Sequence, residues 1–258
     1  MVCRFMRHDA WQDALFVHYA VDAERLQQRL PPELLVDHHD GIAYVGIVCI
    51  SELGIVPFPP GVPLWMVRWL GLSHDAVNVR TYVRPASGNG PPGIYFFSLD
   101  CSSLLPTIGA RLLFGLRYRY SRMARRRPRN DGALRMESNT LLNKATMAVE
   151  WLPQTEPTVR ADRDAALGRF FVERYALYNE PSPLLRLFMP RGASLWYGTI
   201  THEPWPLRKA KLLAYGGFCS GVGILASVGL AEIVTGGAIA HTSSGVGPIE
   251  FFWQGQAV

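Results

Sequence analysis

Residues 78–84 read NVRTYVR, and residues 93–100 read GIYFFSLD. Both stretches are rich in β-branched and aromatic residues, whereas residues 85–92 between them are rich in glycine and proline. This composition is typical of two strands joined by a turn or loop. We therefore predict a β-hairpin over residues 77–100.

The first strand of this hairpin has one polar face. Successive side chains of a strand point to opposite faces, so Arg80 and Tyr82 lie together, opposite Val79 and Val83. A polar face of this kind is often simply solvated. However, residues 94–100 are apolar on both faces, which is typical of a strand covered on both sides. We therefore predict that Arg80 and Tyr82 line a pocket, with Tyr95 beside them.

The rest of the chain alternates between strand-like and helix-like runs. Helical signals cover residues 23–30, 104–114, 163–178 and 207–215, and Asp22 is a good N-cap for the first of them. Strand-like runs cover residues 14–20, 41–50, 117–122, 133–138, 143–151, 196–201 and 249–253, and a proline-rich loop covers residues 57–63. We predict an α+β fold that is mainly β, with residues 1–258 forming one domain.

Composition excludes several classes of protein. A chain with 48% hydrophobic and 18% charged residues can bury a full core and is not disordered. Its first residues lack an export signal, and its four cysteines form no C-x-x-C pair typical of a zinc site. The apolar residues 212–240 are rich in glycine and contain Glu232, which disfavours a membrane-spanning helix. We expect a cytoplasmic protein without metal, cofactor or membrane span.

Several other side chains are candidates for ligand contacts, each with a plainer structural alternative. His202 and Trp205 share a rigid proline-flanked turn that can border a ligand site. His18 lies within an apolar strand, where a histidine is usually structural. Asp100 ends a predicted strand and is a candidate general base, arginine partner or helix cap. Glu173 and Arg174 lie on a predicted helix and form either a structural ion pair or part of the site.

The strongest charge feature is the arginine-rich segment from Arg117 to Arg129, in which tyrosines alternate with arginines. Interleaved cations and aromatic rings occur on surfaces that stack nucleobases. A basic edge strand is also an ordinary device against aggregation. The segment therefore offers a competing hypothesis, a structural or nucleic-acid-associated protein, although we expect no nucleic acid partner.

Motifs along most of the chain resemble the YqjF-like family, domain of unknown function family 2071, of the acetoacetate decarboxylase-like superfamily. The similar segments are HYAVD at residues 18–22, LPP at 30–32, DGIAYVG at 40–46, residues 78–84 and 93–100, ERY at 173–175 with LY at 177–178, and HEPWPL at 202–207. The resemblance implies an antiparallel sheet closed into a barrel-like body around a cavity, with a few helices outside.

The resemblance also implies a chemistry that this chain is poorly equipped to perform. Decarboxylases of the superfamily form a Schiff base on a buried lysine of lowered pKa. Relatives tend to carry a glutamate where this chain has Ala76, and Leu-Pro-Tyr where it has residues 116–118 (LRY), with no lysine near. The only lysines are Lys144, Lys209 and Lys211, of which Lys144 alone is a candidate for the cavity.

We therefore predict a small-molecule-binding or enzymatic domain for a small carboxylate or carbonyl compound, without Schiff-base chemistry. Arginine suits an anion because its planar fork holds a carboxylate through two hydrogen bonds. Arg80 is the predicted anchor, with Tyr82, Tyr95, His202 and Trp205 around it.

Overall fold

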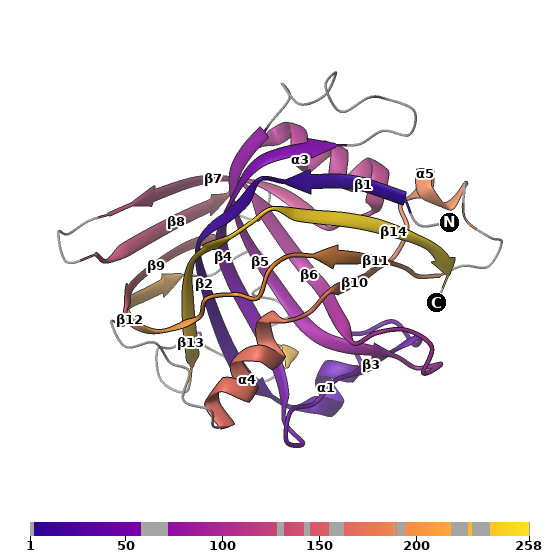
Figure 1. The fold of residues 1–258 in the computed structure, drawn as a ribbon, viewed down its shortest axis with the longest axis horizontal. Coiled ribbons are helices and arrows are strands. Elements are labelled where there is room, and N and C mark those ends of the chain that lie inside the picture. The colour runs from indigo at the N-terminus through magenta and orange to yellow at the C-terminus, as the bar shows by residue number, and fades with distance from the viewer. Residues whose placement is uncertain are drawn as a thin grey trace.

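The computed structural model describes residues 3–57, 72–127, 132–141, 145–154, 163–187, 189, 194–217, 227–228 and 238–257. The described strands form one 14-stranded sheet, so the predicted mainly β fold is confirmed (Figure 1). The strands are β1 Cys3–His8, β2 Ala10–Val21, β3 Leu34–Val36, β4 Ala43–Pro57, β5 Leu72–Pro85, β6 Gly93–Cys101, β7 Tyr118–Arg126, β8 Leu134–Thr140, β9 Thr146–Pro153, β10 Ala176–Asn179, β11 Trp196–Thr201, β12 Arg208–Gly217, β13 Ile239–Val246 and β14 Ile249–Ala257. The helices are α1 Ala23–Gln27, α3 Leu104–Gly109, its π-helical continuation η2 Ala110–Phe114, α4 Arg163–Val172 and α5 Pro183–Arg186.

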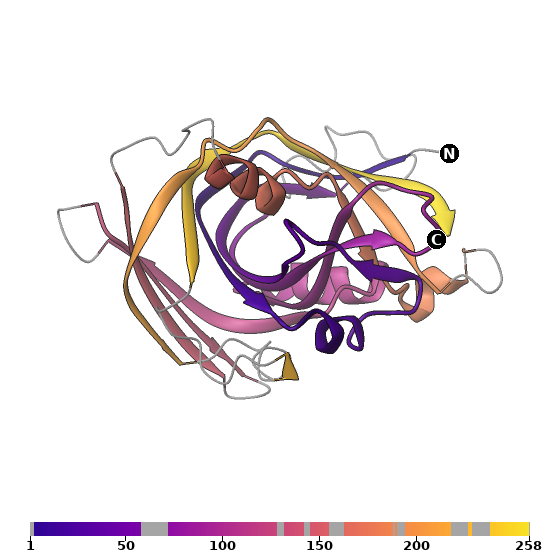
Figure 2. The same cartoon turned by 90° about the horizontal axis from the view of Figure 1, so that it is seen from below.

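Strand pairing closes the sheet into two rings that share the wall β4–β5–β6. The first ring runs from β6 through β10, β11, β14 and β1 back to β4, and the second runs from β6 through β7, β8, β9, β12, β13 and β2 back to β4. In Figure 1 the strands of the two rings lie on opposite sides of the wall. Figure 2 shows the rings from the end at which α1 and α4 lie. The predicted hairpin is the antiparallel pair β5–β6 within this wall.

The shared wall is buried on both faces. On β4, Val45, Ile47 and Cys49 belong to one hydrophobic cluster, whereas Val48 and Ile50 belong to another. This is the two-residue period expected of a strand covered on both sides. The second ring thus holds most of one core, and the first ring holds the other together with the cavity described below.

The helices close the ends of the rings. Asp22 caps α1, as predicted, by accepting a hydrogen bond from the backbone N–H of Arg25 at 2.9 Å. Helix α3 lies at the end opposite to α1 and α4 (Figure 1). Within the part of the chain that the structure describes, no helix has the length and hydrophobicity that a membrane crossing requires.

Two predicted helices are wrong. Residues 208–215 of the predicted helix lie in strand β12, because β9 and β13 pair with its two edges and their hydrogen bonds override a local helical pattern. The helix predicted over residues 163–178 ends at Val172, and the chain continues as β10 between β6 and β11.

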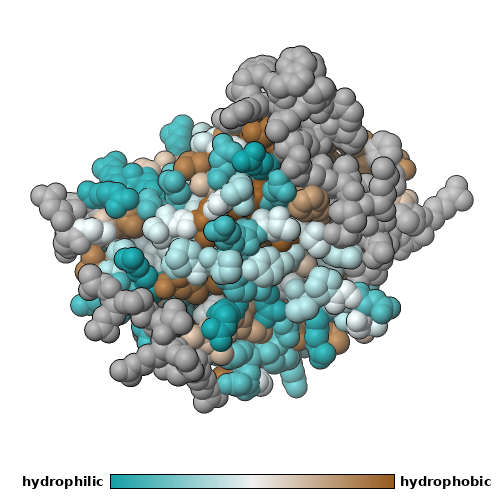
Figure 3. Space-filling model, viewed as in Figure 1, coloured by the Kyte–Doolittle hydropathy of each residue, from teal (hydrophilic) through white to brown (hydrophobic). Residues whose placement is uncertain are grey.

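Three sequence expectations fall outside the described residues: most of the loop at residues 57–63, the position of Lys144, and most of the glycine-rich segment at residues 212–240. On the face seen in Figure 3, hydrophilic and hydrophobic residues of the described chain are interspersed.

Candidate functional site

The first ring encloses a cavity of about 90 Å³. A buried water needs roughly 10–15 Å³ of such space, so the cavity has room for a molecule of a few heavy atoms. We call it the Arg80 cavity. Strands β1, β2, β4, β5, β6, β7, β10, β11 and β14 contribute to its lining, together with the end of α4 and the segments that follow η2, α4 and β11. The lining residues are Met6, His8, Trp11, Phe16, Val48, Ile50, Glu52, Asn78, Arg80, Ile94, Phe96, Leu99, Leu116, Tyr118, Val172, Arg174, Leu177, Trp196, Ile200, His202, Trp205 and Phe251.

Arg80 is the predicted anchor, and its side chain lines this cavity. One Nη2–H donates to the backbone carbonyl of Phe171 at 2.9 Å, which satisfies a carbonyl at the C-terminal end of α4. The guanidinium also lies 5.7 Å from the ring centre of Phe16 and 5.9 Å from that of Tyr82. Among the described residues, Arg80 forms no ion pair with a carboxylate.

Two buried polar atoms that β5 contributes to this cavity have no hydrogen-bond partner among the described residues. They are Nε of Arg80 and Oδ1 of Asn78, which lie two residues apart on the same face of β5. Buried polar groups are nearly always hydrogen-bonded. The pair therefore marks the place in the cavity where a polar ligand can bind.

Arg174 differs from Arg80 because its charge is already paired. Its Nη1–H donates to Asp37 Oδ2 at 2.8 Å, and its Nε–H donates to the carbonyl of Phe170 at 2.7 Å. The guanidinium also lies 4.1 Å from the ring centre of Phe170. Arg174 thus lines the cavity and holds the end of α4, but it offers less uncompensated charge than Arg80.

A buried histidine–tyrosine pair lies beside the guanidinium of Arg80. His18 Nε2 and the hydroxyl of Tyr82 are 2.6 Å apart, and the imidazole stacks on Phe171 at 3.7 Å. Burial, followed by the charge of Arg80, lowers the pKa of His18 well below its usual value. Burial also raises the pKa of Tyr82. Both groups are therefore neutral at pH 7 and support the wall beside Arg80.

The proline-flanked turn lies where the Arg80 cavity approaches the surface. His202 is partly exposed, and its Nδ1–H donates to the carbonyl of Glu203 at 2.7 Å. Burial lowers the pKa of His202, which leaves Nε2 as a proton acceptor. Trp205 stacks on Trp11 at 5.8 Å. Glu173 fixes this turn by accepting a hydrogen bond from the backbone N–H of Trp205 at 2.9 Å.

The cavity has a second polar group that the sequence analysis did not anticipate, formed by His8, Glu52 and His74. Glu52 Oε2 lies 3.6 Å from His8 Nδ1 and 3.4 Å from His74 Nε2. Burial lowers the pKa of His74 by itself, but the thiol of Cys101 and the carboxylate of Glu52 raise it to about 10. Burial likewise raises the pKa of Glu52, but His74 and His8 lower it overall. Glu52 and His74 therefore form a buried ion pair at pH 7.

The sequence contains a signal for this group, although Glu52 and His74 were not among the predicted site residues. Glu52 continues the two-residue period of Val48 and Ile50 on β4, and His74 continues the period of Asn78 and Arg80 on β5. A charged residue on such a buried face indicates a functional site or an internal ion pair. Only the register of β4 on β5, which pairs Glu52 with His74, brings them together.

Six predicted site residues do not belong to the cavity lining. Tyr82, His18 and Glu173 instead hold the side chains and the turn that border it, through the contacts described above. Tyr95 belongs to the opposite hydrophobic cluster, and its hydroxyl accepts a hydrogen bond from Arg117 at 2.9 Å. Asp100 is buried and accepts a hydrogen bond from Thr140 at 3.2 Å. Lys144 lies outside the described residues.

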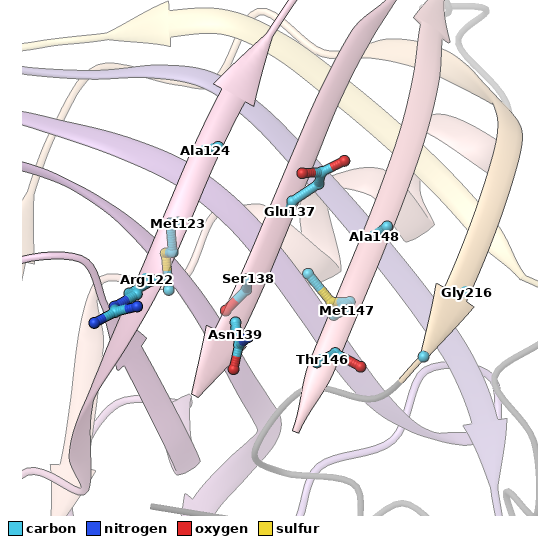
Figure 4. Close-up of a pocket in the computed structure, with 11 residues that line it drawn as sticks. Arg122, Met123, Ala124, Glu137, Ser138, Asn139, Thr146, Met147, Ala148 and Gly216 are labelled. Carbon is cyan, nitrogen blue, oxygen red and sulfur yellow. The ribbon is translucent and has the colours of Figure 1, made fainter. Parts of the chain in front are cut away.

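A wider groove of about 470 Å³ lies on the sheet of the second ring. Figure 4 shows that its lining side chains come from β7, β8 and β9, with Gly216 of β12 at its edge. Its acidic residue, Glu137, already pairs with Arg135 at 2.8 Å. In the described part of the chain no group of side chains has an arrangement that could hold a metal ion, here or in the Arg80 cavity.

Comparison with known families identifies the chain. The sequence model of DUF2071, described as an uncharacterized conserved protein, matches residues 8–246. The chain belongs to the DUF2071 family. It is 30% identical over 212 residues to the uncharacterized protein YqjF of Bacillus subtilis (strain 168), an alignment that covers 80% of this chain and 77% of YqjF.

Solved structures with the same fold are acetoacetate decarboxylase-like proteins. Acetoacetate decarboxylase from Legionella pneumophila has a TM-score of 0.55 at 13% identity, covering 96% of this chain and 84% of that one. The enduracididine biosynthesis enzyme MppR, complexed with pyruvate, has a TM-score of 0.54 at 11% identity, covering 96% and 87%. At these identities the similarity shows the fold alone, and it confirms the predicted acetoacetate decarboxylase-like fold.

One motif of this DUF2071 chain has a structural explanation in the site. Gly46 ends the segment DGIAYVG, and a Cβ placed there would lie 2.9 Å from His18 Cδ2 and 3.3 Å from the hydroxyl of Tyr82. The absence of a side chain at Gly46 therefore leaves room for the His18–Tyr82 pair.

Proposed function

We propose that this protein binds a small carboxylate or carbonyl compound in the Arg80 cavity. The observation that carries the proposal is the pair of buried polar atoms without described partners, Arg80 Nε and Asn78 Oδ1, in one enclosed space. A carboxylate or carbonyl oxygen of the ligand would accept from Arg80 Nε–H, whereas Asn78 Oδ1 accepts only from a donor such as a hydroxyl group of the ligand or a water beside it. The ligand would therefore satisfy the Arg80 donor that the protein leaves unsatisfied.

Charge supports an anion over a neutral ligand. Arg174 is neutralised by Asp37, whereas Arg80 forms no ion pair in the described structure, so its positive charge is available inside the cavity. A partly buried guanidinium binds a carboxylate more strongly than an exposed one, because the surroundings screen the charge less. The fold similarity to MppR complexed with pyruvate, a small oxo acid, supports the same class of ligand.

The proposal is tested by ligand-induced thermal stabilisation with pyruvate, acetoacetate, acetate and acetone. A ligand at 100 times its Kd stabilises the folded state by about 2.7 kcal/mol, which raises the Tm by several degrees. We expect Arg80→Gln to lose this stabilisation. The glutamine amide keeps a hydrogen-bond donor that can reach towards the Phe171 carbonyl, while the charge is removed.

Arg84→Gln is the matched control, because Arg84 is an exposed arginine of the same strand. It should retain the full ligand-induced shift. An equal shift in wild type and Arg80→Gln would place the anion site elsewhere and contradict the proposal.

The competing nucleic acid hypothesis has less support. In the arginine-rich segment, Arg117 pairs with Glu180 at 2.8 Å, and Arg125 pairs with Asp75 at 3.1 Å. These guanidinium groups are neutralised within the protein. We expect no oligonucleotide binding at physiological salt; affinity that falls steeply with added salt would support the competing hypothesis instead.

We also propose a cytoplasmic location. Cys49 and Cys101 are buried and are not joined in a disulfide, which suits a reducing compartment.

A further inference from the structure

A second cavity of about 210 Å³ lies beneath α3 and η2. We call it the helix chamber. Its lining is mostly apolar: Met6, His8, Glu52, Ile55, Leu72, His74, Leu105, Pro106, Gly109, Ala110, Leu113, Phe114, Leu116 and Tyr118. Leu105 and Leu113 are 69% and 51% exposed although they line the chamber, so the chamber reaches the surface at the helix.

The helix chamber adjoins the Arg80 cavity. Five residues line both spaces: Met6, His8, Glu52, Leu116 and Tyr118. On β5, Leu72 lines the chamber and Arg80 lines the cavity. They are eight residues apart, which corresponds to roughly 26 Å of strand. This is far longer than a molecule of a few atoms requires.

The shared wall presents one unpaired donor. Trp11 Nε1–H donates to His8 Nδ1 at 2.8 Å, and an indole nitrogen can only donate. His8 is therefore the neutral tautomer with its proton on Nε2. That atom is buried without a hydrogen-bond partner among the described residues, and the side chain is 3% exposed. A carbonyl oxygen at the junction of the two spaces would satisfy it.

We propose that the ligand is an oxo acid with an aliphatic tail. Its carboxylate lies at Arg80, its carbonyl oxygen accepts from His8 Nε2–H at the junction, and its tail fills the helix chamber. The inference rests on the proposed function, because the carboxylate end is held by Arg80. The proposed function gives the helix chamber no role. In this inference, the chamber selects the ligand by the length of its tail.

The test is the affinity of the full-length protein for straight-chain carboxylates from acetate to dodecanoate, measured by calorimetry. Burying a methylene group contributes enough free energy for roughly fourfold tighter binding per added carbon. We expect affinity to rise in this way once the chain is long enough to enter the chamber. An oxo group near the middle of the chain should tighten binding further, and His8→Phe should remove that increment only.

Gly109→Phe fills the chamber at a position chosen to preserve the fold. Gly109 has helical backbone angles, and an added Cβ there meets no atom within 4 Å. We expect it to reduce the affinity for dodecanoate to that for short acids while leaving pyruvate binding unchanged. Ala110 lines the same chamber, so Ala110→Phe is a second blocking variant. The matched control is Ile108→Phe, because Ile108 is exposed on α3 and lies outside the lining.

The outcomes separate the two proposals. Pyruvate binding that depends on Arg80, without any gain from a longer chain, would overturn the tail assignment and leave the proposed function intact. Long-chain binding that is unchanged by both Gly109→Phe and Ala110→Phe would also overturn the tail assignment. Long-chain binding that is blocked by Gly109→Phe but unaffected by Arg80→Gln would contradict the carboxylate anchor, and with it both proposals.

Discussion

His8 is a single residue whose burial makes stability depend on pH. Burial is the largest of the effects that lower its pKa from 6.5 to about 4. Above pH 6.5 the ring is neutral in both states; as the pH falls towards 4, the unfolded chain takes up a proton that the folded protein does not. Stability should therefore fall over this window, by on the order of 3 kcal/mol from His8 alone. In denaturation curves measured across this window, His8→Phe should reduce the uptake on unfolding by about one proton. An unchanged slope of the free energy of unfolding against pH would contradict this.

At the scale of elements, the parallel pair β6–β10 depends on a close backbone approach. A Cβ added at Gly93 of β6 would lie 2.6 Å from the carbonyl oxygen of Ala176 in β10. That backbone atom cannot move without separating the strands, so Gly93→Ala should cost about 1–3 kcal/mol of folding free energy. Because β10 follows Arg174 directly, ligand affinity should fall as well. Denaturant unfolding checks this against Gly216→Ala, where an added Cβ meets no atom within 4 Å; equal costs would exclude the close approach as the cause.

At the scale of the whole molecule, the two described lysines belong to the second ring, whereas the Arg80 cavity belongs to the first. Lys209 and Lys211 lie on β12, and Lys144 lies outside the described residues. A Schiff base needs a lysine inside the cavity with a lowered pKa. We therefore expect no covalent adduct when the protein is incubated with acetoacetate, reduced with borohydride and weighed by mass spectrometry. A stable adduct mapped to Lys144 would reverse this conclusion.

Part of this protein could be predicted from its sequence because the relevant signals are local. The period of residues 78–84 predicted a strand with Arg80 on its polar face, the apolar residues 94–100 predicted a strand covered on both faces, and Asp22 predicted the start of α1. Motif similarity added the family and the superfamily fold. Each of these depends on residues that are close together in the chain.

The tertiary structure decided which side chains meet. The His8–Glu52–His74 group joins β1, β4 and β5, and its geometry depends on strand register, which no local pattern encodes. Tyr95 lies in the opposite hydrophobic cluster for a similar reason. The alternation along β5 places Arg80 in the cavity, but it does not determine which face of β6 lines that cavity. Helix α4 ends early, and residues 208–217 form a strand, because edges of distant strands supply hydrogen bonds that local propensity cannot anticipate. Long-range pairing, rather than residue type, therefore determined the composition of the site.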